Sequence, residues 1–258
     1  MSVGERAGDV RIAVGDGGAV RTITLCRPEK RNALTHEMFS TLTDAFTREP
    51  KSQERVTVLR AEGPVFCSGV DLRQRSEGSL EESRSPLELL CSAVWRYPLP
   101  VVAVLSGAAI GGGFMLVAHC DFVVAVEDAK VGNSAVQLGL VPPWPLSRQV
   151  ETAARSALAR RLLLMGDLEP ATRLGAVMIT AAVPAEVVEG ELDRLLKRLT
   201  QNAPLSMRAI KATLNAELYV PASHREVVAL IHRAQESDDS KEGVLARRER
   251  REPRFLGR

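Results

Sequence analysis

Cysteines, long apolar runs and charge of a single sign are all scarce in this sequence. Only four of its 258 residues are cysteines, and no two of them form a C-x-x-C pair. This spacing favours free thiols in a reducing compartment over a disulfide framework or a zinc site. No apolar run approaches the roughly 18 residues of a membrane span, and the first ten residues lack the apolar stretch of a secretory signal. We therefore expect a cytoplasmic protein with no membrane partner.

Net charge is also nearly absent, because 34 lysines and arginines stand against 32 aspartates and glutamates. A balance of +2 gives no support to general nucleic-acid binding, so we expect no such partner. Six arginines are concentrated between residues 247 and 258. Such a run is typical of a solvated chain end. The alternative is a contact for a phosphorylated ligand or a neighbouring subunit.

In the first half of the chain, β-rich runs alternate with helical patterns. Strands are predicted at Val20–Leu25, Val56–Leu59, Val101–Leu105 and Phe122–Val126. The run from 101 to 105 is apolar throughout, as expected of a strand buried on both faces. Thr35 is placed to cap a helix between the first two strands. Strands that alternate with helices imply parallel crossovers, and hence an α/β layer architecture.

The second half changes character after residue 186, where nearly everything is typical of helix. Helices are expected at 187–199, 204–218 and 221–247. We therefore divide the chain into an α/β core at 1–200 and a helical extension at 201–258. About 60 residues are too few to bury a good core alone. The extension should pack on its own core or on another subunit.

Two glycine-containing turns follow predicted strands. The first holds Gly111, Gly112 and Gly113, directly before a short helical pattern. Glycines let a ligand approach the main chain closely, and the first N–H groups of a helix have no internal partner. Such a turn can stabilise a developing oxyanion, although a glycine hinge for close strand–helix packing explains it equally well. The second turn spans Gly63–Leu72, and together the two could supply one N–H each.

Motifs spread over nearly the whole chain resemble the crotonase (enoyl-CoA hydratase/isomerase) superfamily. They occur in the family's order and spacing and comprise Arg27–Leu34, Phe66–Leu72, Gly107 with Gly111–Gly113, Cys120-Asp121, Ala129–Gly132, Gly139-Leu140 and the closing Arg-x-Pro-x-Phe at 251–255. The resemblance implies a spiral of ββα turns, with a C-terminal helical part that forms trimers, often paired into hexamers, and covers the active site. It also implies an acyl-CoA thioester as ligand, with no further cofactor and no metal.

The same resemblance implies the residues of the site. The two backbone N–H groups of the oxyanion hole correspond to Ser68 and Gly112. The CoA groove and acyl pocket correspond to further positions, with Arg73 near the CoA phosphates: Ala33, Gly69, Val70, Asp71, Arg73, Gly111, Met115, Ala135 and Trp144.

The chain departs from the family where hydratases carry two glutamates. Met115 and Ala135 stand at these positions. Neither side chain has a titratable proton, so neither can act as a general acid or base. The glycine-rich turn of the family is also replaced here by Val141-Pro142-Pro143-Trp144-Pro145, which predicts a stiff loop. Trp144 either walls the acyl pocket or is simply packed in that loop.

A substitute acid or base has to come from elsewhere. Glu88 opens an apolar helix and is the best single candidate, while Glu77, Glu81 and Glu82 precede it. His119 lies one turn after Met115 and is more typical of a core histidine.

Three functions stay open. The first is an acyl-CoA-processing enzyme, such as an isomerase, thioesterase or decarboxylase, with relocated acid/base groups. The second is a non-catalytic acyl-CoA-binding or regulatory protein. The third is an ordinary enoyl-CoA hydratase of fatty-acid metabolism.

Overall fold

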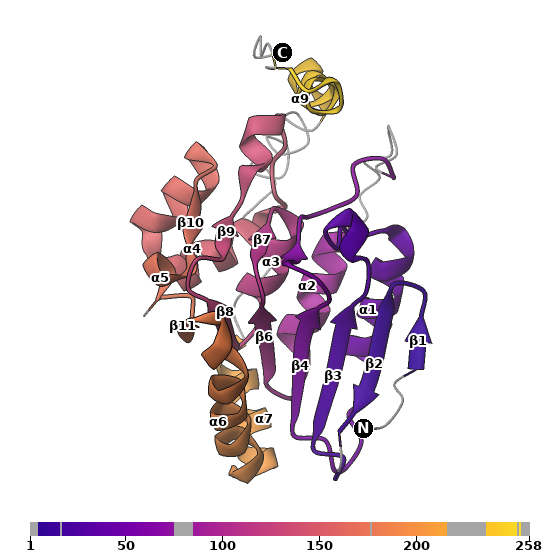
Figure 1. Cartoon of the computed structure of the whole chain (residues 1–258), viewed down its shortest axis with the longest axis vertical. Helices are drawn as coiled ribbons and strands as arrows, with labels where there is room; N and C mark the ends of the chain where they lie inside the picture. The colour runs from indigo at the N-terminus through magenta and orange to yellow at the C-terminus, as the bar shows by residue number, and fades with distance from the viewer. Residues whose placement is uncertain are drawn as a thin grey trace.

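The computed structural model describes residues 5–15, 17–74, 85–175, 177–215, 236–251 and 253. A seven-stranded sheet forms the centre of the molecule, in the order β1-β2-β3-β4-β6-β8-β11 (Figure 1). Its strands are β1 Glu5–Ala7, β2 Val10–Val14, β3 Val20–Leu25, β4 Val56–Ala61, β6 Val101–Leu105, β8 Phe122–Val126 and β11 Ala181–Val183. From β3 to β11 all neighbours are parallel, which confirms the predicted α/β architecture.

A second, four-stranded sheet has the order β10-β9-β7-β5. Its strands are β5 Val65–Cys67, β7 Ala108–Ile110, β9 Lys130–Gly132 and β10 Leu168–Pro170. Strands β5, β7 and β9 each follow a strand of the larger sheet after a short turn, so the chain repeats a strand–strand unit. After β7 a helix follows at once, at the edge of the smaller sheet.

Helices cover both faces of the larger sheet (Figure 1). The longer ones are α1 His36–Thr47, α2 Pro86–Arg96, α3 Gly112–Ala118, α4 Trp144–Arg160, α6 Val188–Gln201, α7 Pro204–Asn215 and α9 Asp238–Glu249. Short helical turns complete the set: η1 Pro28–Lys30, η2 Ser134–Leu138, η3 Arg161–Met165, α5 Ala171–Leu174 and η4 Ala185–Val187. Helices α1, α2 and α3 contribute to the main apolar core on one face. Helix α6 covers the other face, where Val58, Val102 and Val124 meet Leu192.

Helix α1 illustrates how local sequence positions an element. The Thr35 side chain accepts a hydrogen bond from the N–H of Met38 and so caps the helix, as predicted. Met38, Leu42 and Phe46 then share the buried face.

Helix α7 is held to the core by polar contacts. The Nζ of Lys211 lies 2.6 Å from Oδ2 of Asp121 and donates to the carbonyl of Leu99 at 3.0 Å. Trp95 and Asn215 exchange two hydrogen bonds, one from each side chain to the other's carbonyl oxygen. The two ends of the extension lie apart in Figure 1, because α9 packs on η2 at the opposite end of the molecule. The division of the chain at residue 200 stays a prediction.

Two sequence predictions need correction or qualification here. Trp144 and Pro145 form the first turn of α4, with Pro143 as its N-cap, because proline fits a first helical turn. The predicted loop is therefore only Val141–Pro143, and Trp144 lies half-buried at a helix start. The predicted helix at 221–247 falls partly outside the described residues, within which α9 begins at Asp238.

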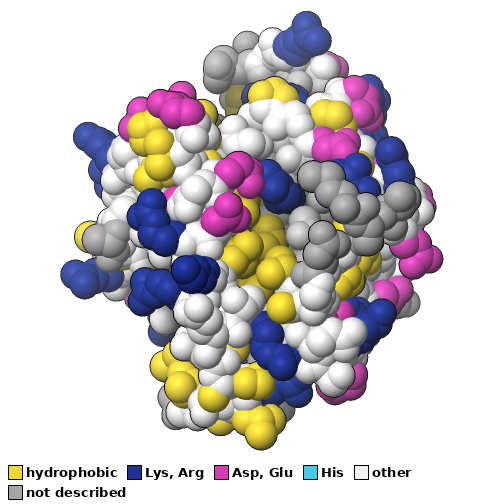
Figure 2. Space-filling model, turned by 60° about the horizontal axis from the view of Figure 1, so that its bottom comes forward, with side chains coloured by type: hydrophobic (Ala, Val, Ile, Leu, Met, Phe, Trp, Pro, Cys, Tyr) yellow, Lys and Arg dark blue, Asp and Glu magenta, His cyan; other side chains and the backbone are white. Residues whose placement is uncertain are grey.

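Within the described ranges, each helix is too short or too polar to cross a membrane. The four cysteines are all free thiols, as predicted. Figure 2 shows hydrophobic side chains gathered in a hollow on one face of the molecule, with lysines and arginines around it.

Candidate functional site

Two backbone segments meet at the end of the smaller sheet. They are the turn after β5, at Gly69 and Val70, and the start of α3, at Gly111 and Gly112. A Cβ built on Gly69 would lie 3.3 Å from the nitrogen of Gly112, and one built on Gly112 would lie 3.4 Å from the nitrogen of Val70. Gly69 has φ +106, a conformation that other residues rarely adopt, so this close approach depends on glycine.

The N–H groups of Val70 and Gly112 are both available at this point. Gly112 is the first residue of α3, so its N–H has no partner within the helix. Among the described residues, no hydrogen-bond acceptor is found for either N–H group. Two unpaired donors that face one space can bind a single oxygen atom, including one that carries developing negative charge.

Ser68 does not supply the first donor, and that prediction is wrong. Its N–H donates to the carbonyl oxygen of Arg31 at 3.0 Å, so it is already occupied. Val70, predicted only as a lining residue, has the free N–H instead. The sequence carries no signal for this choice, because every residue except proline brings an N–H group and only the path of the backbone decides where it points.

Asp71, predicted as a lining residue, is held by its neighbours. Its carboxylate pairs with Arg27 at 2.9 Å and accepts the N–H of Arg73 at 3.1 Å. Burial by itself raises the pKa of Asp71, but the bonds from Arg27 and the Arg73 N–H outweigh it, so the pKa is lowered. Asp71 is thus a fixed anion. Arg27 also donates to the carbonyl of Ala33 at 3.0 Å, while the Arg73 side chain is exposed.

The two positions of the missing glutamates lie close to this turn. Met115 belongs to α3, accompanies the main apolar core and is 1% exposed. Ala135 lies half-buried in η2. This short helix follows strand β9, whose last residue, Gly132, accepts the N–H of Gly111 at 3.0 Å through its carbonyl oxygen. The Asn133 side chain caps η2 by accepting the N–H of Ala135 at 2.8 Å. These elements therefore bring no acid or base to the turn.

His119 is a core histidine. Its Nδ1 lies 2.7 Å from the carbonyl oxygen of Met115, and its Nε2 is buried without a partner among the described residues. Desolvation by burial lowers the pKa of His119 to about 4 despite the opposing hydrogen bond to Met115. The ring is therefore neutral near pH 7 and donates from Nδ1. Cys67, below the same turn, is also inactive as a nucleophile, because burial raises the pKa of its thiol to about 12.

Glu88 lies in the first turn of α2, where the side chain of Ser85 accepts its N–H. The preceding residue, Leu87, reaches the site directly, since its Cδ1 lies 3.5 Å from the position of a Cβ on Gly112. Glu88 is half-buried. It remains the candidate acid or base, while Glu77, Glu81 and Glu82 lie outside the described residues.

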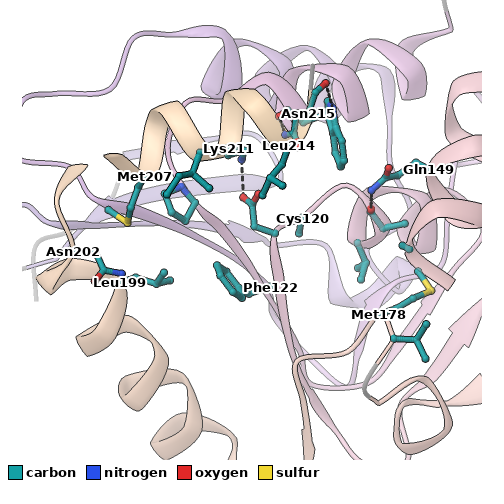
Figure 3. A pocket seen from close by; sticks show the side chains of 18 residues that line it. Cys120, Phe122, Gln149, Met178, Leu199, Asn202, Met207, Lys211, Leu214 and Asn215 are labelled. Carbon is teal, nitrogen blue, oxygen red and sulfur yellow. Dashed lines mark hydrogen bonds and ion pairs between the residues drawn. The ribbon is translucent and has the colours of Figure 1, made fainter. Parts of the chain in front are cut away.

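A cavity of about 540 Å³ lies elsewhere, around the far end of α3 and beneath α7 (Figure 3). Its lining includes Phe122, Met178, Leu199, Met207 and Leu214, which are apolar. Among its polar groups, Lys211 pairs with Asp121 and Nε2 of Gln149 donates to the Ala118 carbonyl, while Oε1 of Gln149 is buried without a partner among the described residues. None of the predicted site residues lines this cavity. The cavity offers volume but no convergent free donors, so the Val70–Gly112 turn is the better candidate site.

Comparison with known proteins finds relatives over nearly the whole chain. The profile of one family, described as enoyl-CoA hydratase/isomerase, matches residues 15–258. A protein of Rhodobacter capsulatus named as a probable enoyl-CoA hydratase is 35% identical over 260 aligned residues, which cover 96% of this chain and 98% of the relative.

Solved structures show the same architecture. An enoyl-CoA hydratase/isomerase from Pseudoalteromonas atlantica superposes with a TM-score of 0.81 at 27% identity, covering 96% of this chain and 100% of that one. A methylmalonyl-CoA decarboxylase complexed with 2S-carboxypropyl-CoA superposes with a TM-score of 0.90, covering 98% of this chain and 100% of that one. The identity in that pair is 22%, so the likeness concerns the fold alone.

Proposed function

Because this chain belongs to the enoyl-CoA hydratase/isomerase family, we propose that it binds acyl-CoA thioesters, with the carbonyl oxygen between the N–H groups of Val70 and Gly112. The crotonase-type α/β fold expected from the sequence is confirmed by the solved relatives. The observation that carries the proposal is the close approach of two backbone segments whose N–H groups, at Val70 and Gly112, have no acceptor among the described residues.

The donors would act on the thioester as an oxyanion hole. Hydrogen bonds from two fixed N–H groups polarise the carbonyl and stabilise the negative charge that an enolate or tetrahedral intermediate places on its oxygen. No side chain is needed for this step. Met115, Leu87 and Val70 would provide apolar surroundings that exclude water, which strengthens such electrostatic interactions.

The acid/base chemistry decides which reaction follows. The family relation supports an acyl-CoA-processing enzyme of the lyase or isomerase kind, with Glu88 as its proton carrier. The alternative is a non-catalytic acyl-CoA-binding or regulatory protein. The neutral His119, the protonated Cys67, and the apolar Met115 and Ala135 favour that alternative. Ordinary enoyl-CoA hydration, which the names of the relatives suggest, is the third and weakest candidate.

Calorimetry with hexanoyl-CoA tests the site through a matched pair of variants. Gly112→Pro deletes one donor at a first helical position, where proline is tolerated. Gly112→Ala keeps the N–H while adding a Cβ, 3.2 Å from Cγ2 of Val70, so it controls for crowding. We expect Gly112→Pro to abolish binding and Gly112→Ala to retain much of it. Equal affinity of the wild type and the folded proline variant would exclude this site.

A further inference from the structure

The backbone of the segment Arg31–Leu34 is hydrogen-bonded to the turn that contains Val70. The carbonyl of Arg31 accepts the N–H of Ser68 at 3.0 Å. The N–H of Leu34 donates to the carbonyl of Gly69 at 2.8 Å, and the carbonyl of Leu34 accepts the N–H of Asp71 at 2.9 Å. Leu34 and Val70 thereby form an isolated parallel bridge.

These three bonds fix the direction of the Val70 N–H. Successive peptide groups of an extended chain point to opposite sides, so the bonds made by Ser68, Gly69 and Asp71 toward Arg31–Leu34 turn the Val70 N–H the other way. Gly112 lies next to the Val70 nitrogen, since a Cβ built on Gly112 would be 3.4 Å from it. The backbone of Arg31–Leu34 therefore acts as a template for the donor.

The Asn32 side chain holds this segment in place, together with the bond from Arg27 to the carbonyl of Ala33. Asn32 is 0% exposed, and its amide makes three hydrogen bonds. Its Oδ1 accepts the N–H of Arg27 at 2.8 Å, while its Nδ2 donates to the carbonyls of Glu62 at 2.9 Å and Val65 at 2.8 Å. The last two carbonyls flank the start of β5, the strand that leads into the Val70 turn. The Asn32 side chain thus links the Arg31–Leu34 segment to Arg27 and to the start of β5.

The backbone at this point is also unusual. Arg31 and Asn32 have φ values of 53° and 52°, so two consecutive residues other than glycine adopt the left-handed conformation. Each such residue is less favourable than in the ordinary helical or extended regions, although asparagine tolerates it better than most. The side-chain bonds of Asn32 support this conformation, alongside the backbone bonds from Arg31 to Pro28 and from Asn32 to Arg27.

We propose that Asn32 is a positioning residue for the oxyanion hole, setting the direction of the Val70 N–H through the backbone of Arg31 and Leu34. This inference rests on the proposed function of the Val70–Gly112 turn. Asn32 contacts neither the thioester nor the reacting atoms. Its removal should therefore change how strongly a bound carbonyl is polarised more than it changes how tightly the ligand binds.

Two variants separate the side-chain bonds from the left-handed backbone. Asn32→Asp keeps the size, the tolerance of positive φ and the acceptor for Arg27, but it replaces the donor to Glu62 and Val65 with an oxygen. Asn32→Gly removes every side-chain bond while favouring positive φ. The local change that the two variants share is therefore the loss of the donor to Glu62 and Val65. If one of them fails to fold, the other still decides the question.

The readout is the infrared stretch of hexanoyl-CoA labelled with ¹³C at the thioester carbonyl, measured when bound to the intact protein. Bound to the wild type, the band should move to lower wavenumber, because two donors polarise the carbonyl. In both Asn32 variants most of this displacement should be lost, while affinity falls by about tenfold or less, the equivalent of roughly one hydrogen bond. Asn215→Ala, which removes the bond to Trp95 under α7, is the control for a general loss of stability. It should leave the carbonyl band unmoved.

The outcomes separate the inference from its premise. A wild-type band at the position found in water would remove the proposed function, and the inference with it. A wild-type displacement that both folded Asn32 variants retain would overturn the positioning role alone. An equal loss in Asn215→Ala would show a global structural effect and would overturn it too.

Discussion

At the scale of single residues, the proposed function makes its sharpest prediction about Met115 and Ala135. Water addition to an enoyl thioester needs one group to activate water and another to deliver a proton, and each contributes about 10²–10⁴-fold. We therefore expect hydration of crotonyl-CoA to be slower than in a two-glutamate hydratase by several orders of magnitude. A spectrophotometric assay that follows loss of the enoyl absorbance checks this, with acyl-CoA binding measured in parallel.

Two variants give that prediction its control. Met115→Glu combined with Ala135→Glu should restore part of the hydration if the half-buried Trp144 leaves room for water. Rapid hydration by the unmodified protein would contradict the prediction. Glu88→Gln would then identify the proton carrier, since Glu88 follows directly after Leu87 at the site.

A second prediction at this scale concerns His119 and the pH dependence of the free energy of unfolding. Its folded-state pKa of about 4 lies below the ordinary 6.5. Between these values the unfolded chain binds a proton that the folded chain does not. The stabilisation is therefore complete above about pH 6.5 and lost as the pH falls toward 4, by about 3 kcal/mol in all.

Urea unfolding at a series of pH values measures this loss. His119→Gln should remove most of the decline over that window, whereas His36→Gln, at an exposed position, should leave it unchanged. The same decline in all three proteins would show that other groups are responsible.

At the scale of elements, the sequence predicts best the strands with continuous apolar or β-branched runs and the helix with a capping residue. The apolar run Val101–Leu105 is β6, with all five residues buried, and Thr35 caps α1 as expected. The strands of the smaller sheet escaped notice because three residues are too few to show a period. The sequence predicts a loop where α4 begins, at Trp144. Proline breaks the interior of a helix, but it is tolerated in the first turn, which is where Pro145 lies.

The attachment of α7 is predicted to depend on Lys211. Its side chain is 8% exposed and its partner Asp121 is 24% exposed, so the ion pair is largely screened from water. Removing one member of such a pair leaves the other without compensation, which destabilises by about 3–5 kcal/mol when burial is complete. We expect Lys211→Ala to lower the free energy of unfolding by roughly 3 kcal/mol.

A matched lysine provides the control. Lys197 lies exposed on α6, and Lys197→Ala should change stability by no more than about 0.5 kcal/mol. Hydrogen exchange of α7 amides should accelerate only in the Lys211 variant. Equal effects of the two substitutions would mean that the ion pair does not hold α7.

At the scale of the whole molecule, α7 exposes more apolar side chain than is usual for a surface helix, both on its surface and in the cavity beneath it. Leu205 and Leu214 are each 77% exposed and Ile210 is 59% exposed, while Lys211 points inward. The family resemblance predicts self-association to a trimer or hexamer, and exposed leucines at these positions fit that expectation. Light scattering at micromolar concentration should give three or six times the 28.0 kDa of the chain. A stable monomer would contradict the prediction.

The candidate site could be located from the sequence but not assembled from it. The two glycine-containing turns, at Gly69 and Gly112, were found because glycine leaves a mark in the sequence. The sequence does not show which N–H group points inward. That depends on the bridge between Leu34 and Val70, which are 36 residues apart. The roles of Ser68 and Val70 were exchanged for this reason.

A site built from peptide N–H groups has a consequence for mutational scanning. Replacing Val70 with alanine leaves its donor in place, so a scan of side chains would register the donor residue as nearly neutral. The strongest signals would come from Asn32, which never meets the ligand, and from Gly69, whose φ of +106 excludes most replacements. Under the proposed function, the backbone groups that hold the thioester are independent of the side chains that would react. Substitutions at Met115 or Ala135 should then change the reaction while the same acyl group stays bound.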